Sequence, residues 1–231
     1  INIKGNAFRK SENIELPADK LGFINYKIEW EPTGNKENTR NNFKEFTIEV
    51  VETKQKILLL ANGSHPDLGA INSALSVNPN IETEIQNFAD FKGNYKPYQL
   101  VIAHGLPTAS TNISALVKAE VPKLFILSGK TSTTQLGRQL KLFNITSNRI
   151  AFDYAQAAEN EAFALFTPDN QTSEILENAP PLLVPYGEIS LSPDAQVYAY
   201  QNIGGIETRK PLIAFFPETP LRSKTGVIGG E

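Results

Sequence analysis

Hydrophobic and polar residues alternate along the first fifty positions of the chain. The alternation is clearest in FINYKIEW, residues 23–30, and FKEFTIEVV, residues 43–51, and it is typical of strands with one buried face. The segment between them, EPTGNKENTRNN, is rich in Gly, Pro and Asn, which favours a loop. Residues 1–5 and 11–16 are further predicted strands. The pattern therefore predicts a small all-β module over residues 1–52.

From residue 53 onward the predicted strands lose this alternation and become apolar throughout. The clearest are ILLLA at 57–61, LVIA at 100–103 and LFIL at 124–127. Uniformly apolar strands are typical of a parallel sheet that helices cover on both faces. Helix-like apolar spacing lies between them and begins near Pro66, Pro107 and Thr133. This order predicts a doubly wound α/β sheet with right-handed crossovers.

The last third of the chain returns to strand-forming sequence. PLLVPYGEISL, AQVYAYQ and PLIAFF carry the β-branched and aromatic residues that strands favour. Gly204-Gly205, between the last two, supplies a turn in which a positive φ costs little. A further strand is predicted within Thr225–Glu231. We therefore assign residues 53–231 to an α/β domain with a β-rich C-terminal part.

Composition limits the classes of partner. The chain has 231 residues, of which 40% are hydrophobic and 20% charged, as in soluble globular proteins. Its net charge is −3 and it has no basic stripe, so we expect no nucleic-acid partner. No apolar run reaches the ~18 residues of a membrane-spanning helix, so we do not expect this part of the protein to cross a membrane.

The chain contains neither cysteine nor methionine. The lack of cysteine excludes disulfides, thiolate metal sites and cysteine nucleophiles. The lack of an initiator methionine leads us to expect a processed form or an excised piece of a longer protein.

Several segments resemble a group of large bacterial envelope proteins. ENTRNNFKEFTIEVVETKQKILLLANGSHPD resembles their junction between an immunoglobulin-like module and a class I glutamine amidotransferase-like domain. YQLVIAHGLPT resembles the middle strand of that domain, and KTGVIGGE resembles its tail. The resemblance implies a truncated Ig-like module over residues 1–52. It also implies a flavodoxin-like domain over 53–231, cut at its C-terminus, in a membrane-anchored parent exposed in the periplasm or outside a bacterial membrane.

The resemblance does not extend to the catalytic residues. Class I amidotransferases need a cysteine at a turn between a strand and a helix, followed far downstream by a histidine and a glutamate. The corresponding turn, LFILSGKTSTTQ, offers Ser128, Gly129 and Lys130 and no thiol. Both histidines, His65 and His104, precede it. Glutaminase chemistry by the family's route is therefore excluded, and fold alone does not carry function.

His65, His104 and Asp67 form the first candidate site. Each histidine follows the carboxyl end of a predicted strand, where doubly wound sheets bind ligands. A strand spacing of about 4.8 Å would bring the imidazoles within ~10 Å of each other. Two imidazoles and a carboxylate, with Asp90 after the next strand, are a metal-like donor set. The more ordinary interpretation is that each histidine satisfies backbone groups in its own turn or faces solvent, and no metal is assigned.

The SGKTS turn is the second candidate, as a ligand-binding segment. Its residues would be Ser128, Gly129 and Lys130. The sequence resembles the end of a P-loop, but that motif needs a glycine where Leu124 stands. The turn could still present N–H groups to an anion. The more ordinary interpretation is that Ser132 or Thr131 caps the following helix.

Other enzyme classes have weaker support. Gly-x-Ser-x-Gly is absent from the turn and no histidine follows Ser128, so a serine-hydrolase triad is not predicted. Acidic residues around EAFALF could form a carboxylate pair for glycoside chemistry, but the segment is amphipathic, and the more ordinary interpretation is that the acids form its solvated face. These residues are Asp153, Glu159, Glu161 and Asp169.

The sequence therefore predicts a non-catalytic envelope module without a cofactor, either structural or binding a protein partner or small ligand. The alternative is a metal-dependent or hydrolytic enzyme that uses His65, His104 and Asp67. The two hypotheses differ in geometry. The enzyme needs both imidazoles in one pocket with a carboxylate in reach, and it fails if they lie more than ~12 Å apart.

Overall fold

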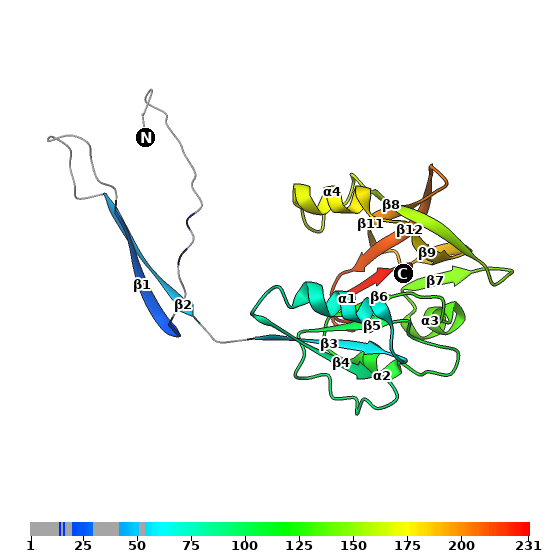
Figure 1. Cartoon of the computed structure of the whole chain (residues 1–231), viewed down its shortest axis with the longest axis horizontal. Coiled ribbons are helices and arrows are strands. Elements are labelled where there is room, and N and C mark those ends of the chain that lie inside the picture. The colour runs from blue at the N-terminus through cyan, green and yellow to red at the C-terminus, as the bar shows by residue number, and fades with distance from the viewer. Residues whose placement is uncertain (1–13, 15, 17–19, 30–41, 51–53) are drawn as a thin grey trace, which may run out of the picture. The chain divides into compact units, whose positions relative to one another are not determined.

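The computed structural model describes residues 14, 16, 20–29, 42–50 and 54–231 (Figure 1). The strands predicted at residues 1–5 and 11–16 fall outside this part of the chain, apart from residues 14 and 16. The chain divides into two compact units, Ile1–Thr53 and Lys54–Glu231.

The first unit contains an antiparallel pair of strands, β1 (Gly22–Glu29) and β2 (Phe43–Val50). Both alternating strands are therefore confirmed. Tyr26 of β1 lies opposite Phe46 of β2, and their rings stack with centroids 5.7 Å apart. The assignment of this unit to an Ig-like fold stays a prediction.

The second unit is a mixed α/β domain. Its elements are β3 (Gln55–Ala61), α1 (Pro66–Leu75), β4 (Ile81–Asn87), β5 (Leu100–His104), α2 (Ser114–Lys118), β6 (Lys123–Ile126), α3 (Thr133–Leu140), β7 (Phe143–Thr146), β8 (Phe152–Glu159), α4 (Asn170–Asn178), β9 (Leu182–Pro185), β10 (Glu188–Leu191), β11 (Gln196–Ile203), β12 (Ile206–Phe216) and β13 (Thr225–Ile228). Nine strands form one sheet in the order β4-β3-β5-β6-β13-β12-β11-β8-β9, and β7 pairs with β10 separately.

Five neighbouring strands of the large sheet, β4, β3, β5, β6 and β13, are parallel. The three uniformly apolar runs are β3, β5 and β6, which lie side by side in one direction, as predicted. Ala61 lies opposite His104, and His104 lies opposite Ile126. The carboxyl ends of these strands therefore meet at one edge of the sheet.

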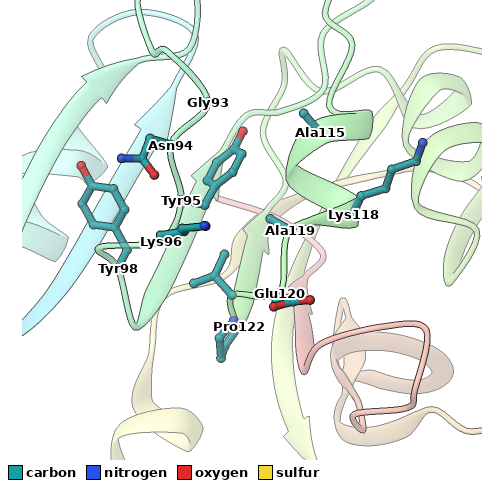
Figure 2. A pocket seen from close by; sticks show the side chains of 11 residues that line it. Gly93, Asn94, Tyr95, Lys96, Tyr98, Ala115, Lys118, Ala119, Glu120 and Pro122 are labelled. Carbon is teal, nitrogen blue, oxygen red and sulfur yellow. The ribbon is translucent and has the colours of Figure 1, made fainter.

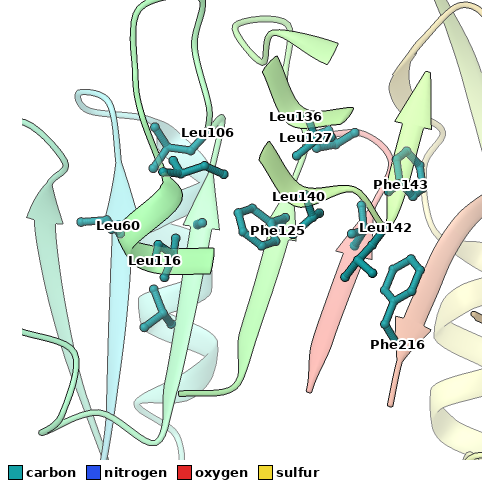
Figure 3. Packing of buried hydrophobic residues seen from close by; sticks show 14 of the residues in the cluster. Leu60, Leu106, Leu116, Phe125, Leu127, Leu136, Leu140, Leu142, Phe143 and Phe216 are labelled. Atoms are coloured by element: carbon teal, nitrogen blue, oxygen red, sulfur yellow. The ribbon is translucent and has the colours of Figure 1, made fainter. Parts of the chain in front are cut away.

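Helices cover both faces of the parallel strands, which explains why their sequences do not alternate. Leu59 of β3 packs in a cluster with Leu68 of α1. Leu60, its neighbour along the strand, packs on the opposite face in a cluster with residues of α2 and α3. Figure 3 shows this second cluster, which includes Phe125 of β6. Burial on both faces fixes the strands that position the site.

The remaining strands of the sheet, β12, β11, β8 and β9, pair antiparallel and confirm the predicted β-rich C-terminal part. Gly204 and Gly205 connect β11 to β12 with φ values of 61° and 81°, a conformation that glycine adopts without strain. The chain then returns through β13, which is antiparallel to β12 and parallel to β6.

The EAFALF segment follows β8, which ends at Glu159, and residues 160–168 contain no helix. The apolar residues of this segment contact other parts of the domain, since Phe163 and Phe166 both lie against Tyr198 and Phe215. The four acids belong to different elements and not to one face of this segment: Asp153 and Glu159 lie in β8, and Asp169 is the N-cap of α4.

In the part of the chain that the structure describes, no helix has both the length and the hydropathy needed to cross a membrane.

Candidate metal centre

His65 lies directly after the turn that follows β3 and caps the N-terminus of α1. Its backbone is extended, and its Nδ1 atom accepts a hydrogen bond from the Asp67 backbone N–H at 3.3 Å. Pro66 occupies the first helical position, where its missing N–H costs nothing. His65 therefore satisfies a backbone group in its turn, as the ordinary interpretation proposed. The same geometry fixes its ring at the carboxyl edge of the sheet.

His104 is the last residue of β5, and its side chain is only 3% exposed. Its ring centroid lies 4.5 Å from that of His65, well inside the 12 Å limit set by the enzyme hypothesis. Its Nε2 atom lies 3.1 Å from Asp67 Oδ2. The structure thus brings all three residues of the first candidate site together.

Glu231 completes the cluster and was not predicted. It follows β13, and its Oε2 atom lies 3.4 Å from His65 Nε2 and 3.6 Å from His104 Nε2. Its Oε1 atom accepts a hydrogen bond from the Gly129 backbone N–H at 3.0 Å. The sequence signal was a carboxylate just after a predicted strand. Only the parallel direction of β13 shows that this strand ends at the same edge as His65 and His104.

The backbone before Glu231 is tightly enclosed. A Cβ atom on Gly230 would lie 2.6 Å from the carbonyl oxygen of Leu183 in β9, so only glycine fits here. Leu183 also donates its N–H to the Glu231 carbonyl at 2.8 Å. These contacts hold the Glu231 side chain toward the two imidazoles.

One donor atom from each of His65, Asp67, His104 and Glu231 can be chosen so that all four lie within 4.8 Å of one another. Zinc–ligand distances of about 2.0–2.2 Å place neighbouring tetrahedral ligands roughly 3.3–3.6 Å apart. Three donor pairs already lie at 3.1, 3.4 and 3.6 Å. The cluster therefore has nearly the dimensions of a tetrahedral coordination shell.

The polar groups of the cluster do not satisfy one another. Among the described residues, buried Glu231 Oε2 forms no hydrogen bond, although two imidazole nitrogens are near it. Two carboxylates and two neutral imidazoles would together carry a charge of about −2, and the part of it at the buried Glu231 Oε2 is costly without a counter-charge. A divalent cation would supply that charge and a partner for the orphan oxygen, so the residues present fit a metal ion.

The three residues of the SGKTS turn lie beside this cluster. Ser128 is buried, and its Oγ accepts a hydrogen bond from the Lys130 N–H at 3.1 Å. No hydrogen bond joins Ser128 to either imidazole within the described residues, so the structure gives no support to a serine nucleophile. Ser132 caps α3 by accepting a hydrogen bond from the Gln135 N–H, as the ordinary interpretation of the turn predicted.

A small cavity of about 10 Å³ borders the two imidazoles, and its lining includes Gly105, Ser128 and Lys130. A space of this size holds about one water molecule. Asp90 does not join the site, because it lies exposed in the turn after β4.

A much larger cavity lies elsewhere, between residues 93–98 and α2 with the segment that follows it (Figure 2). Its volume is about 750 Å³, and its lining includes Tyr95, Tyr98 and Lys118 but no histidine. Tyr98 donates its hydroxyl hydrogen bond to Glu84. This cavity therefore offers no set of metal donors comparable with that at the carboxyl edge.

No family model and no curated protein sequence matches the chain. Among solved structures, the chain is similar to a proposed GMP synthase subunit from Thermoplasma acidophilum. The identity is 12%, the TM-score is 0.46, and the match covers 77% of this chain and 84% of the other. A likeness at this TM-score carries no argument for function, which must come from the site itself.

Proposed function

We propose that this chain binds a divalent transition-metal ion through His65, Asp67, His104 and Glu231. The observation that carries the proposal is the convergence of these four donors from three distant segments, with one buried carboxylate oxygen unpaired. Imidazole nitrogens favour Zn²⁺, Ni²⁺ and Fe²⁺ over Mg²⁺ and Ca²⁺. Zn²⁺ is the first ion to test because it prefers four tetrahedral ligands of this kind.

A hydrogen-bonded cluster without metal is the competing explanation. In that case two protonated imidazoles would balance the two carboxylates. Only one of the close imidazole–carboxylate pairs, His104 with Asp67, meets the geometry of a hydrogen bond. The contacts of Glu231 Oε2 with both rings do not. A metal ion between the four donors accounts for both the short distances and the missing hydrogen bonds.

The scaffold that we propose for this site is a flavodoxin-like, class I amidotransferase-like domain that has lost its thiol chemistry. The strand order β4-β3-β5-β6 supports this, because the first strand of the domain lies between the second and third, as in flavodoxin-like sheets. The site also occupies the edge where such sheets bind ligands. The envelope location of the parent protein stays a prediction.

A bound ion of this class lowers the pKa of a coordinated water molecule and so provides hydroxide near neutral pH. That chemistry makes metal-dependent hydrolysis the second candidate function. The cavity beside the imidazoles, with room for about one water, favours it. A role in binding without catalysis uses the same four donors, so metal binding is tested first.

The test is a calorimetric titration of chelator-treated protein with Zn²⁺, with the bound metal counted by mass spectrometry. We expect one ion per chain and a Kd below about 1 µM, which corresponds to about 8 kcal/mol. Co²⁺ should give the visible absorption bands of a tetrahedral N/O site. Glu231→Gln should weaken binding strongly while still accepting the Gly129 hydrogen bond, which keeps the local fold.

Glu218→Gln is the matched control, because Glu218 is exposed and lies outside the cluster. The proposal is overturned if the wild-type protein binds none of Zn²⁺, Ni²⁺, Co²⁺ or Fe²⁺ at micromolar concentration. It is also overturned if Glu231→Gln binds Zn²⁺ as tightly as Glu218→Gln does.

A further inference from the structure

A second cavity adjoins the proposed metal centre. It has a volume of about 480 Å³ and lies between the start of α3 and two later segments, residues 145–152 and 185–186. Lys130 lines both this cavity and the small cavity beside His65 and His104. Gly129, whose N–H holds Glu231, also lines it. Two residues of its lining, Gly129 and Lys130, therefore also border the proposed metal centre.

The lining of this cavity is cationic although the whole chain is acidic. It contains Lys130 and Arg149 and no aspartate or glutamate. Neither cation forms an ion pair with any carboxylate in the described part of the chain. Two cations that share a cavity without a counter-charge make it attractive to an anion.

Arg149 is held in place before any ligand arrives. Its Cζ atom lies 4.4 Å from the centroid of the Tyr186 ring, which also lines the cavity. Its backbone is fixed by Ser147, whose hydroxyl accepts from the Arg149 N–H at 3.2 Å and donates to the Arg149 carbonyl at 2.7 Å. Although Arg149 is exposed, the ring contact restrains its guanidinium, which therefore loses less freedom when it binds an oxyanion.

Neutral donors surround the two cations. Five serine and threonine residues line the cavity: Thr131, Ser132, Thr133, Thr134 and Ser147. The hydroxyl oxygen of Thr131 already accepts a hydrogen bond from the Ser128 N–H, and that of Ser132 accepts from the Gln135 N–H. Both hydroxyls are therefore oriented to donate their protons elsewhere, and an oxyanion can accept several such bonds.

We propose that this cavity binds the phosphate or phosphonate group of a small organic anion whose neighbouring atoms reach the metal ion. The inference rests on the proposed metal centre and names the class of ligand for it. The volume suits a small organic molecule rather than a lone phosphate ion. Lys130 and Arg149 supply the charge, and the hydroxyls fix the orientation of the oxygen atoms.

The experiment uses phenylphosphonate, whose carbon–phosphorus bond resists hydrolysis, with the dimethyl ester of the same acid as an uncharged control. Binding to the Zn²⁺ form is measured by calorimetry, and proximity to the metal by ³¹P relaxation in the Co²⁺ form. Lys130→Met and Arg149→Met should each weaken phenylphosphonate binding about 10-fold, as expected for loss of one charge-assisted contact. Lys96→Met, an exposed lysine in the unrelated 750 Å³ cavity, should have no effect.

Zn²⁺ affinity is measured separately for every variant and should not change with Lys130→Met or Arg149→Met. If Zn²⁺ binds but phenylphosphonate does not, the anion site is wrong and the metal centre stands. The same conclusion follows if phenylphosphonate has equal affinity for the Lys130→Met/Arg149→Met double variant and the wild type. If ³¹P relaxation in the Co²⁺ form is no faster than in the Zn²⁺ form, the anion does not reach the metal and the inference fails. If none of Zn²⁺, Ni²⁺, Co²⁺ or Fe²⁺ binds, both proposals fail.

Discussion

Two groups of buried or partly buried polar side chains lie at opposite edges of the parallel strands, and they differ in how many of their hydrogen bonds are made. At the amino edge, Lys123 begins β6 and is 2% exposed. Its ammonium group donates to the carbonyls of Val117 and Ala119, at 3.3 and 2.8 Å, and to the Ser223 hydroxyl at 2.6 Å. At the carboxyl edge, four ionisable side chains meet and Glu231 Oε2 still has no hydrogen bond in the described structure.

This difference in hydrogen bonding distinguishes a charged group that stabilises the fold from a group of charged side chains that binds a ligand. The Lys123 ammonium has three N–H donors, and three acceptor oxygens lie around it, so its burial needs no bound ligand to explain it. The cluster at the carboxyl edge has more hydrogen-bond acceptors than there are donors around it, as the unpaired Glu231 Oε2 shows. A buried polar group without a partner costs about 1–3 kcal/mol, and an ion that binds only the folded state would remove that cost.

The largest effect that we expect is the loss of metal affinity in His104→Ala. Removal of the most buried donor should weaken Zn²⁺ binding at least ~100-fold, since loss of even outer-shell partners costs 10–100-fold. Calorimetric titration of both proteins measures the ratio. Asp90→Ala, which removes an exposed carboxylate outside the cluster, should bind Zn²⁺ like the wild type. If His104→Ala and Asp90→Ala bound Zn²⁺ with equal affinity, the carboxyl edge would not be a metal site and would not differ from the amino edge in this respect.

Metal binding should also stabilise the fold. Zn²⁺ at 100 times its Kd should raise the free energy of unfolding by about 2.7 kcal/mol, or Tm by roughly 5–10 °C for a domain of this size. Thermal unfolding followed by circular dichroism measures the shift. Lys123→Met should keep the shift, whereas His104→Ala should lose it. An equal shift in all three proteins would point to non-specific metal binding.

At the amino edge, Lys123→Met should destabilise the domain by about 2 kcal/mol at pH 7, because it leaves the Val117 and Ala119 carbonyls short of a donor. Denaturant unfolding monitored by circular dichroism gives the value. Lys141→Met, an exposed lysine, is the control. A Lys123→Met protein as stable as the control would show that the three hydrogen bonds do not offset the burial of the charge.

The smallest effect concerns pH. Burial lowers the pKa of Lys123 from 10.5 to about 8. Between these values the unfolded chain binds more protons than the folded one, so the free energy of unfolding should rise with pH through this window. The rise should be modest, because the three acceptors favour the ammonium form and offset part of its burial. Denaturation curves from pH 7 to 10.5 should show it in the wild type and not in Lys123→Met.

Much of the fold could be predicted because its signals are local. The apolar run at 57–61 shows burial on both faces without any knowledge of its neighbours, and Gly204-Gly205 marks its own turn. The structure around EAFALF could not be predicted, because Phe163 and Phe166 pack on Tyr198 and Phe215, which lie far along the chain. Contacts of that kind leave no local signal.

The candidate site could be predicted in part for the same reason. His65 and His104 each follow an apolar run that predicts a strand of a parallel sheet. Because parallel strands end at the same edge, the prediction places the two histidines close together. Glu231 depends on the direction of β13, which returns to β6 only after the antiparallel strands β11 and β12. No pattern within residues 225–231 distinguishes a parallel strand from an antiparallel one, so its carboxylate could not be placed.

The enclosure of Gly230 against Leu183 has a consequence for assembly during folding. Residues 230–231 are bonded to β9, so a folding intermediate in which this segment is still free would offer at most three of the four donors. Such an intermediate would bind a metal ion weakly, and the chain with this segment docked would bind it firmly. The ion would therefore favour the completed arrangement of the sheet, because it would link His65 and Asp67, which follow β3, to Glu231, which follows β13.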